Sequence, residues 1–438
     1  MTPEVIVVGA GPGGAATAII LAELGVSVLV LDRARFPRSK ICGEYLSPEA
    51  PRVLDRLGVL KAVDDTAVPI AGMRITAPDG TVACGAYRAH GRFRPYREHA
   101  MALPRATLDE LLVERLRALP VDFREEVRVT DLVLERGRVV GVRALDRGHR
   151  ELVLRAPLVV GADGRASVVA QRLGLRRPHR LRRMALVTYV EGLPRMSEPL
   201  APVSGHPRFE PASRPPLQKS EPASRPPLRK SEPASRPPLQ WAEIFVDPPD
   251  YAILNPVASD RANLSLVVPL ADAAPWSARL ETFFAARARQ LPWLARRLAG
   301  ARLAAPVRAL GPLAYEVAPP SVGGVLLVGD AGGFFDPFTG EGVFTALRSA
   351  ELATETVVSA LRAGDCSREM LARYDRARHA AFAGKVRLAR AIQVIVAHRR
   401  LANIVARALA RRPRRLDLLL GVLGDYVPPR ALLWPADW

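Results

Sequence analysis

Cysteine is scarce in this sequence, and its few copies lie far apart. Cys42, Cys84 and Cys366 are the three cysteines among 438 residues, and none belongs to a CxxC pair. We therefore expect neither a disulfide framework nor a zinc site, and we expect the protein to reside in a reducing compartment. The histidines are also scattered, without a metal-ligand spacing and without the serine and acid of a hydrolase. We expect no metal site and no hydrolytic activity.

Lysine is nearly absent as well, so arginine carries the positive charge. The chain has five lysines, yet Lys and Arg number 63 against 44 Asp and Glu, a formal net charge of +19. No nucleic-acid motif or aromatic stacking platform accompanies this charge, which argues against nucleic-acid binding. Residues 366–438 hold 15 basic and 5 acidic residues. Their helical spacing predicts a basic helical region packed on its own protein, with contact to a membrane surface as the alternative.

Long uninterrupted apolar runs are missing too. The apolar stretch that starts at Val5 is broken by Gly9, Gly11 and Pro12, which excludes a membrane span and predicts a strand followed by a turn. No signal peptide precedes that strand. We therefore expect a cytoplasmic protein, with membrane association left open.

A proline-rich repeat interrupts the second half of the chain. Residues 210–240 contain the tandem units EPASRPPLQKS, EPASRPPLRKS and EPASRPPLQ. Each unit has a single leucine, so neighbouring units have no apolar face to bury against each other. This pattern predicts a solvated, disordered insertion over residues 205–240 between two strands. A docking site for a proline-reading partner is the alternative, and it would make the protein a scaffold.

The first 32 residues predict a dinucleotide-binding unit. Gly9, Gly11 and Gly14 form a GxGxxG pattern directly after the first strand, and Asp32 closes the next strand. Glycine is needed where the backbone turns tightly and approaches a pyrophosphate at a helix N-terminus, and the acid accepts hydrogen bonds from a ribose. Strand, turn, helix and acid together make this a strong signal. The pattern alone does not distinguish NAD from FAD.

Two later segments resemble the second and third flavin motifs of the p-hydroxybenzoate hydroxylase superfamily. They are GADGRASVVAQRLG at residues 161–174 and GGVLLVGDAGGFFDPFTGEGVFTALRSA at residues 323–350. The resemblance implies bound FAD, with Asp330 on the ribityl chain and the start of a helix near the electron-rich edge of the reduced flavin. The cofactor-binding residues that it implies are Gly9, Gly11, Gly14, Asp32, Arg33, Cys42, Arg105, Val129, Asp163, Gly329, Asp330, Pro337, Gly340, Gly342 and Val343. For Arg105, an exposed residue at a helix start is the alternative.

The resemblance also implies a fold. We expect an α/β protein with a doubly wound, Rossmann-like FAD-binding domain, an inserted antiparallel-sheet substrate domain and a helical C-terminal region. Alternating apolar segments such as MALVTYVEG and YAILNPV predict the antiparallel sheet. The expected boundaries are 1–70, 101–178 and 310–365 for the FAD-binding domain, 71–100 and 179–309 for the substrate domain, and 366–438 for the basic helical region.

Within this superfamily, FPRSKICGEYLSP at residues 36–48 is most similar to the geranylgeranyl reductase group. There a Lys-x-Cys-Gly segment lies beside the flavin ring, which makes Cys42 and Glu44 candidate catalytic residues. A buried apolar cysteine and a solvated loop glutamate are the alternatives. Halogenases carry a different segment here and a tryptophan-rich element later, so halogenation is disfavoured.

The predicted activity is reduction or dehydrogenation of a hydrophobic, polyprenyl- or polyketide-like substrate by hydride transfer through flavin N5. The alternative enzyme is an NAD(P)H-dependent monooxygenase that hydroxylates its substrate. No second dinucleotide-binding turn is present in the sequence, so NAD(P)H stays a candidate electron donor only. The alternative of another class is the scaffold.

Overall fold

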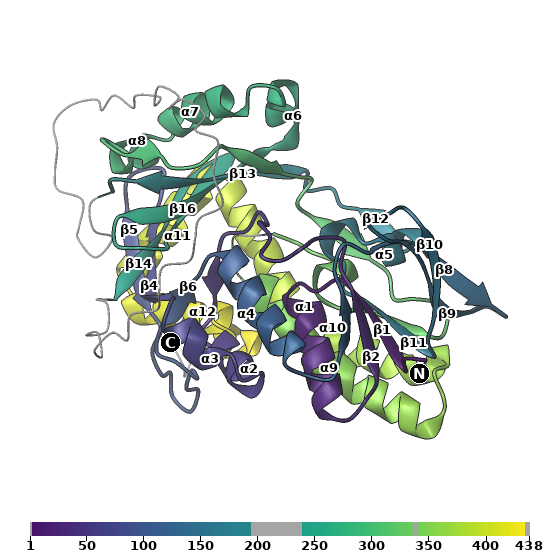
Figure 1. Ribbon diagram of the computed structural model, residues 1–438. Helices are drawn as coiled ribbons and strands as arrows, with labels where there is room; N and C mark the ends of the chain where they lie inside the picture. The colour runs from purple at the N-terminus through teal and green to yellow at the C-terminus, as the bar shows by residue number, and fades with distance from the viewer. Residues whose placement is uncertain (1, 194–238, 337, 339, 341, 434–438) are drawn as a thin grey trace.

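The computed structural model describes residues 2–193, 239–336, 338, 340 and 342–433 (Figure 1). A five-stranded parallel sheet has the strand order β20-β11-β1-β2-β7. Continuous valine and leucine runs form its central strands because both faces are buried. The strands are β1 (Val5–Val8), β2 (Val28–Leu31), β7 (Asp122–Arg124), β11 (Leu158–Gly161) and β20 (Val325–Leu327).

Helices cover one face of this sheet, and an antiparallel sheet covers the other. Side chains from alternate positions of β1, such as Val5 and Val7, pack against the helices, whereas Ile6 and Val8 pack against the small sheet. The helices are α1 (Pro12–Glu23), α2 (Ala50–Arg56), α3 (Leu60–Asp64), α4 (Arg105–Arg117) and α9 (Gly342–Ala363). The small sheet consists of β8 (Arg128–Glu135), β9 (Arg138–Leu145) and β10 (Glu151–Arg155), and α5 (Val168–Arg172) packs beside it.

A ten-stranded sheet forms the second half of the molecule. Its main path runs β17-β13-β16-β15-β14-β4-β6-β3, with β18 paired to β13 and β5 paired to β4. Only the β4–β14 pair is parallel among the pairs described here. The strands are β3 (Tyr45–Leu46), β4 (Val68–Thr76), β5 (Val82–Ala86), β6 (Ala100–Ala102), β13 (Arg183–Glu191), β14 (Gln240–Asp247), β15 (Asp250–Pro256), β16 (Arg261–Pro269), β17 (Arg302–Leu303) and β18 (Arg308–Leu310). β12 (Arg176–Pro178) and β19 (Tyr315–Val317) form a separate pair.

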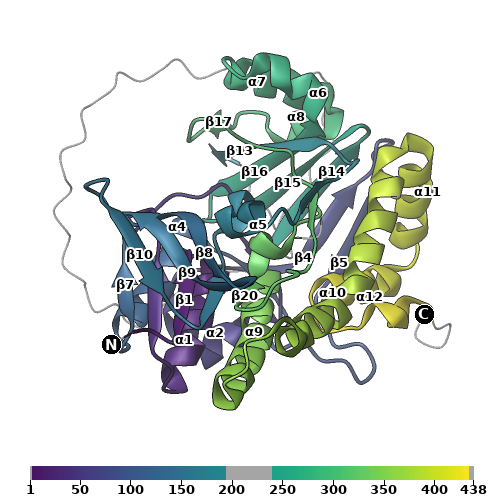
Figure 2. The same ribbon diagram turned by 90° about the vertical axis from the view of Figure 1, so that its right-hand side faces the viewer.

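The period of two along these strands directs alternate side chains to two cores. Phe245 and Leu264 pack under α6 (Leu270–Ala273), α7 (Leu280–Gln290) and α8 (Pro292–Arg297), which lie over one side of the sheet in Figure 1. Ile244 and Val267 face the other way, toward the C-terminal helices. Those helices are α10 (Arg368–Ala397), α11 (Arg399–Ala410) and α12 (Pro413–Leu423), and Figure 2 shows α11 and α12 next to β5.

The predicted fold class is therefore confirmed, with one addition. The face of the parallel sheet opposite its helices carries β8, β9 and β10 instead of a second helical layer. The C-terminal region is helical, and it packs on the protein itself: Leu416 and Leu420 of α12 lie so close to Gly85 of β5 that a Cβ there would be 2.6 Å from Leu416. No helix in the described part of the chain is long and apolar enough to cross a membrane. Residues 210–238 of the repeat lie outside the described residues. The disordered insertion predicted up to residue 240 is wrong at its end, because Gln240 is the first residue of β14 and is buried there.

Candidate active site

The three glycines of the first motif meet at the N-terminus of α1, but for different reasons. Gly9 has φ of +98°, and a Cβ on Gly14 would lie 1.8 Å from the Gly9 carbonyl oxygen, so the packing of the turn itself requires both glycines. A Cβ on Gly11 would come within 4 Å of a single described group, Arg38 Nη2 at 3.5 Å. Gly11 therefore leaves space beside a cation, as a site for a pyrophosphate requires.

Asp32 joins the glycine turn to the second strand. Its Oδ2 accepts a hydrogen bond from the Ala10 amide at 2.7 Å, and its Oδ1 accepts one from the Ala34 amide at 2.8 Å. Arg38 Nη2 lies 3.9 Å from Asp32 Oδ2. The carboxylate is thus held rigidly at the end of β2, where a ribose is expected, while the neighbouring Arg33 is exposed.

Three cations, Arg38, Lys40 and Arg105, gather near this turn. Burial and the Arg105 guanidinium lower the pKa of Lys40, although the Asp330 carboxylate acts in the opposite direction. Arg38 Nε is buried without a hydrogen-bond partner among the described residues. A cluster of positive charge with an unpaired donor is suited to an anion, and the pyrophosphate of FAD fits it. Arg38 and Lys40 were not predicted as cofactor-binding residues, although both belong to FPRSKICGEYLSP, the segment that the resemblance places beside the flavin ring.

Arg105 is buried, not exposed at a helix start. It is 6% exposed and makes a bidentate ion pair with Asp109, one turn further along α4, with N–O distances of 2.8 and 3.0 Å. Burial alone would lower the pKa of Arg105, but Asp109 and then Cys42 outweigh it and the pKa is raised. The spacing of an arginine and an aspartate four residues apart in RATLDEL could have indicated this pair.

The second motif reaches the same place through Gly164. A Cβ there would lie 3.3 Å from Lys40 Nζ. Asp163 Oδ2 accepts the Val168 amide at 2.7 Å, whereas Asp163 Oδ1 is buried without a partner in the described part of the chain. Burial raises the pKa of Asp163. Val129 is a buried residue of β8, and its role toward FAD stays a prediction.

The third motif places a turn and a helix start next to these groups. Gly329 has φ of +62°, and the Tyr315 hydroxyl donates to the Asp330 carbonyl oxygen at 2.6 Å. Gly340 has φ of +69°, and a Cβ on it would lie 2.6 Å from the ring of Tyr45. Gly342 begins α9 and is followed by the buried Val343, whereas Pro337 lies outside the described residues.

The loop of residues 42–44 is fastened to the ten-stranded sheet through Glu44. This residue has φ of +58° and is 4% exposed, so it is not a solvated loop glutamate. Its Oε1 accepts the Arg105 amide at 3.1 Å and the Tyr189 hydroxyl at 2.5 Å, and its Oε2 lies 3.4 Å from Asn263 Nδ2. Burial raises the pKa of Glu44, although these hydrogen bonds oppose the effect. The Glu44 amide contacts Cys42 Sγ at 3.3 Å.

The residues that hold this loop form one row across the sheet. Tyr189, Asn263 and Asn255 are neighbours in register on β13, β16 and β15. Asn263 donates to the Cys42 carbonyl oxygen at 3.0 Å, and Asn255 donates to the Gly43 carbonyl oxygen at 2.7 Å. The sequence did not predict these three contacts. Alternation of apolar and polar residues along a strand predicts a sheet, but it does not indicate which loop a polar side chain contacts.

A second polar group lies further along the same face. The Tyr251 hydroxyl of β15 donates to Asp336 Oδ1 at 2.7 Å, and the Phe338 amide donates to the same oxygen at 2.9 Å. Burial raises the pKa of Asp336 to about 6. The sheet thus holds both the loop of residues 42–44 and the segment around Asp336, the two segments that the resemblance places around the flavin ring.

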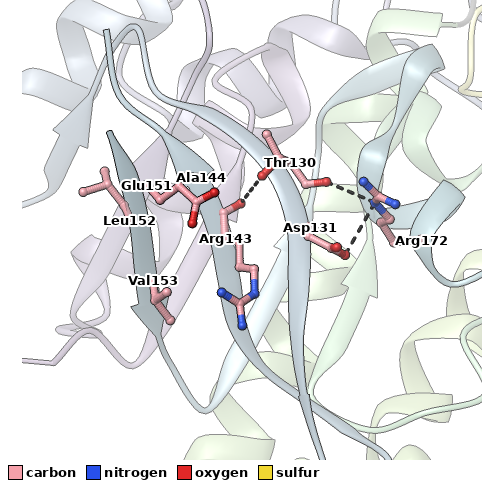
Figure 3. Close-up of a pocket in the computed structure, with 8 residues that line it drawn as sticks. All are labelled: Thr130, Asp131, Arg143, Ala144, Glu151, Leu152, Val153 and Arg172. Carbon is pink, nitrogen blue, oxygen red and sulfur yellow. Dashed lines mark hydrogen bonds and ion pairs between the residues drawn. The ribbon is translucent and has the colours of Figure 1, made fainter. Parts of the chain in front are cut away.

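A small hollow on the β8–β10 sheet is a different feature (Figure 3). It has a volume of about 190 Å³. Arg172 on its rim donates to the Thr130 carbonyl oxygen at 3.0 Å and lies 3.4 Å from Asp131, so this cation is already paired. None of the residues predicted to contact FAD or substrate lines this hollow.

Comparison with known proteins agrees with this geometry. Residues 2–208 match the protein family described as FAD binding domain. Digeranylgeranylglycerophospholipid reductase of Methanocella arvoryzae is 26% identical over 381 residues, covering 85% of this chain and 81% of that protein. Menaquinone reductase of Mycolicibacterium smegmatis is 28% identical over 364 residues, covering 81% of this chain and 76% of that protein.

Other matches belong to flavoproteins that are named for different reactions. The 6-methylpretetramide 4-monooxygenase of Streptomyces rimosus is 36% identical over 174 residues, covering 39% of this chain and 41% of that enzyme. The solved structure of the flavin-dependent brominase Bmp2 superposes with a TM-score of 0.78 at 17% identity, covering 99% of this chain and 98% of that one. The match to the brominase structure shows a shared fold alone. FAD binding is confirmed, and no electron donor follows from these matches.

The two classes of glycine predict different effects of substitution. In Gly11→Val, the added side chain clashes with no backbone atom, so the stability of the apoprotein should be nearly unchanged. The side chain occupies the expected position of the pyrophosphate, so FAD affinity should fall at least tenfold. In Gly14→Ala, the clash with Gly9 should lower the free energy of unfolding of the apoprotein by about 2–3 kcal/mol. Urea unfolding without FAD and titration of FAD fluorescence separate the two. Equal apoprotein stabilities would contradict this assignment.

The raised pKa of Asp336 predicts that this residue stabilises the folded protein more at acidic pH than at neutral pH. A carboxyl whose pKa rises from 3.8 to about 6 on folding contributes stability below pH 3.8 that is lost as the pH rises through 6. Because two pKa units correspond to about 3 kcal/mol, the unfolding free energy of wild type minus that of Asp336→Asn should fall by up to that amount from pH 4 to pH 7. For Asp365, whose pKa is lowered by hydrogen bonds with Ser367, the difference between wild type and Asp365→Asn should instead rise with pH, and this rise should occur between the lowered pKa and 3.8. A pH-independent difference for Asp336 would refute the expectation.

Proposed function

We propose that this FAD-dependent oxidoreductase, a relative of the p-hydroxybenzoate hydroxylase superfamily as its sequence predicted, reduces or dehydrogenates a hydrophobic, polyprenyl- or polyketide-like substrate. The observation that carries the proposal is the buried carboxyl group of Glu44 beside Cys42. Both belong to the loop that the resemblance places at the flavin ring, and three hydrogen-bond donors fix the carboxyl group.

The chemistry requires a proton as well as a hydride. Bound FAD supplies or accepts the hydride at N5. Saturation of a carbon–carbon double bond adds a hydride to one carbon and a proton to the other, and dehydrogenation removes both. Glu44 is suited to hold that proton, because burial raises its pKa and so keeps the acid protonated to higher pH. Cys42 is the second candidate, since it is partly buried and lies within the same loop.

The face of the sheet next to this loop supports the proposed substrate class. Next to the row of Tyr189, Asn263 and Asn255, the same face carries Val187 and Ile253 with Ser265 between them. Ala185 and Val267 follow, beside Tyr251. An apolar surface bounded by polar groups is typical of a site for a largely hydrophobic ligand. The reductases among the relatives, which are named for a geranylgeranyl lipid and a quinone, support the same class.

The second candidate function is hydroxylation, favoured by the match to a monooxygenase over residues that make up 39% of the chain. The two functions differ in their use of oxygen. A monooxygenase should consume oxygen and NADPH together when substrate is added. A reductase should saturate a double bond anaerobically once the protein has been photoreduced. An anaerobic screen of lipid, quinone and aromatic candidates, followed by flavin absorbance, therefore tests the proposal.

Cys42 has a matched control elsewhere in the chain. Cys42→Ser should lower the rate of substrate reduction by the photoreduced protein at least tenfold, because a hydroxyl is a much weaker acid than a thiol. Cys84→Ser, which changes an exposed thiol on β5, should leave the rate within twofold of wild type. Single-turnover absorbance measurements give both rates. Equal rates for the two variants would remove Cys42 from the reaction.

Glu44→Gln should reduce the same rate about 100-fold while leaving FAD content unchanged, because the amide keeps the shape but carries no acidic proton. Glu49→Gln is the control, because burial also raises the pKa of Glu49. Its carboxyl group accepts a hydrogen bond from the Tyr96 amide and none from the partners of Glu44. The wild-type rate should decline as the pH rises through the raised pKa of Glu44, whereas the variant should lose that dependence. A pH profile shared by wild type and Glu44→Gln would contradict the role of Glu44.

A further inference from the structure

The carboxyl group of Glu44 is buried, so a proton has to reach it through the groups around it. Glu44 is 4% exposed. An acid that gives its proton to a substrate must receive another proton before the next reaction. The contacts of this carboxyl group therefore determine the route by which it is reprotonated.

Three donors bond the carboxyl group among the described residues, and two of them are amides. The Arg105 amide lies 3.1 Å from Oε1, and Asn263 Nδ2 lies 3.4 Å from Oε2. The nitrogen of an amide donates a hydrogen bond but does not accept a proton in exchange. The Tyr189 hydroxyl, 2.5 Å from Oε1, can donate one proton while its oxygen accepts another. Tyr189 is thus the contact suited to pass a proton to Glu44.

The other ionisable groups near Glu44 are engaged elsewhere. The Arg105 guanidinium pairs with Asp109 at 2.8 Å. Cys42 interacts with Arg105, and its Sγ contacts the Glu44 amide at 3.3 Å. Within the described part of the chain, neither the guanidinium nor the thiol bonds a carboxyl oxygen of Glu44. These contacts leave Tyr189 as the relay candidate.

Tyr189 also connects Glu44 to the surface of the protein. Residues two apart on a strand face the same way, so Glu191 follows Tyr189 on this face of β13, and Arg261 of β16 is its neighbour in register. The side chains of Glu191 and Arg261 are 25% and 39% exposed, with 3.6 Å between Oε1 and Nε. Tyr189 itself is partly buried. Along the strand it lies between a buried acid and a solvated ion pair.

The guanidinium of Arg261 lies 4.5 Å from the centre of the Tyr189 ring. Burial and the hydrogen bond to Glu44 raise the pKa of Tyr189, whereas Arg261 acts in the opposite direction. The hydroxyl therefore keeps its proton at neutral pH and is available as a donor. The cation over the ring stabilises the negative charge that develops on the phenol as its proton leaves.

We propose that Tyr189, with Arg261 over its ring, carries protons between solvent and Glu44. When Glu44 has given its proton to a substrate carbon, the Tyr189 hydroxyl passes its proton to Oε1 and takes one from water. One solvent proton is thus consumed for each double bond that is saturated, and dehydrogenation runs the transfers in reverse. Tyr189 acts on the substrate through Glu44 and is a positioning residue. The inference rests on the proposed role of Glu44.

The test follows hydrogen–deuterium exchange of the Glu44 carboxyl proton in the full chain loaded with FAD and without substrate. Rapid mixing into D₂O shifts the infrared carbonyl stretch of the protonated carboxyl group, and its absence from Glu44→Gln assigns the band. Tyr189→Phe should slow the exchange at least tenfold. Glu44 stays protonated in this variant, because the lost hydrogen bond lowers the pKa of Glu44 in the wild type. Tyr374→Phe is the control: it removes a buried hydroxyl bonded to the Leu327 carbonyl oxygen and should leave the rate within twofold.

Two further comparisons distinguish a relay from a structural role. Asn263→Ala also removes a hydrogen bond to Glu44, but it should not slow the exchange, since a loosened loop admits water more easily. Arg261→Gln should slow the exchange about threefold, because the phenol loses its neighbouring cation. Arg302→Gln removes the other cation paired with Glu191, at 3.0 Å, and should leave the rate nearly unchanged.

Exchange at the wild-type rate in Tyr189→Phe would overturn the proposal. Equal slowing by Tyr189→Phe and Asn263→Ala would do the same, as would equal rates for Arg261→Gln and Arg302→Gln. If exchange slows as expected but photoreduced protein reduces no hydrophobic candidate, the proposed function is wrong and the relay stands. If Glu44→Gln impairs reduction but exchange does not depend on Tyr189, the relay alone is wrong.

Discussion

The buried carboxyl group of Glu44 is the contact on which the arrangement of this molecule depends. It accepts hydrogen bonds from the first amide of α4, from Tyr189 of β13 and from Asn263 of β16. These partners belong to both halves of the protein. An ionisable group that is 4% exposed costs free energy unless its bonds are made, so the loop of residues 42–44 and the ten-stranded sheet are fixed relative to each other.

The expected FAD site is built from residues that are distant in sequence and that constrain each other. Gly9 and Gly14 permit the turn of the backbone, Gly11 leaves space, and Arg38 supplies charge beside that space. Lys40 connects this group to the second motif at Gly164 and to the third motif through the charge of Asp330. Burial lowers the pKa of Lys40 most, and repulsion by the Arg105 and Arg38 guanidinium groups lowers it further. A bound diphosphate would relieve that repulsion, which couples FAD binding to the stability of the site.

What the sequence predicted well is what local rules determine. The glycine spacing and the strand that ends at Asp32 located the nucleotide turn, and the period of two located the strands of the large sheet. The missed residues act through contacts between distant segments. Tyr189 and Asn263 reach Glu44 across more than 140 residues of chain, and no periodicity reveals such a contact. Arg105 is buried because Asp109 neutralises it, which its position at the start of a helix did not indicate.

The two polar contacts of the sheet also separate two sides of the flavin region. Glu44 and Cys42 lie on the side of the row formed by Tyr189, Asn263 and Asn255, with apolar side chains next to them. Asp336 lies toward α10, where it lines a cavity of about 660 Å³ and accepts a hydrogen bond from the Tyr251 hydroxyl. A hydrophobic substrate would therefore meet apolar side chains on the Glu44 side, whereas the Asp336 side presents charged and aromatic groups.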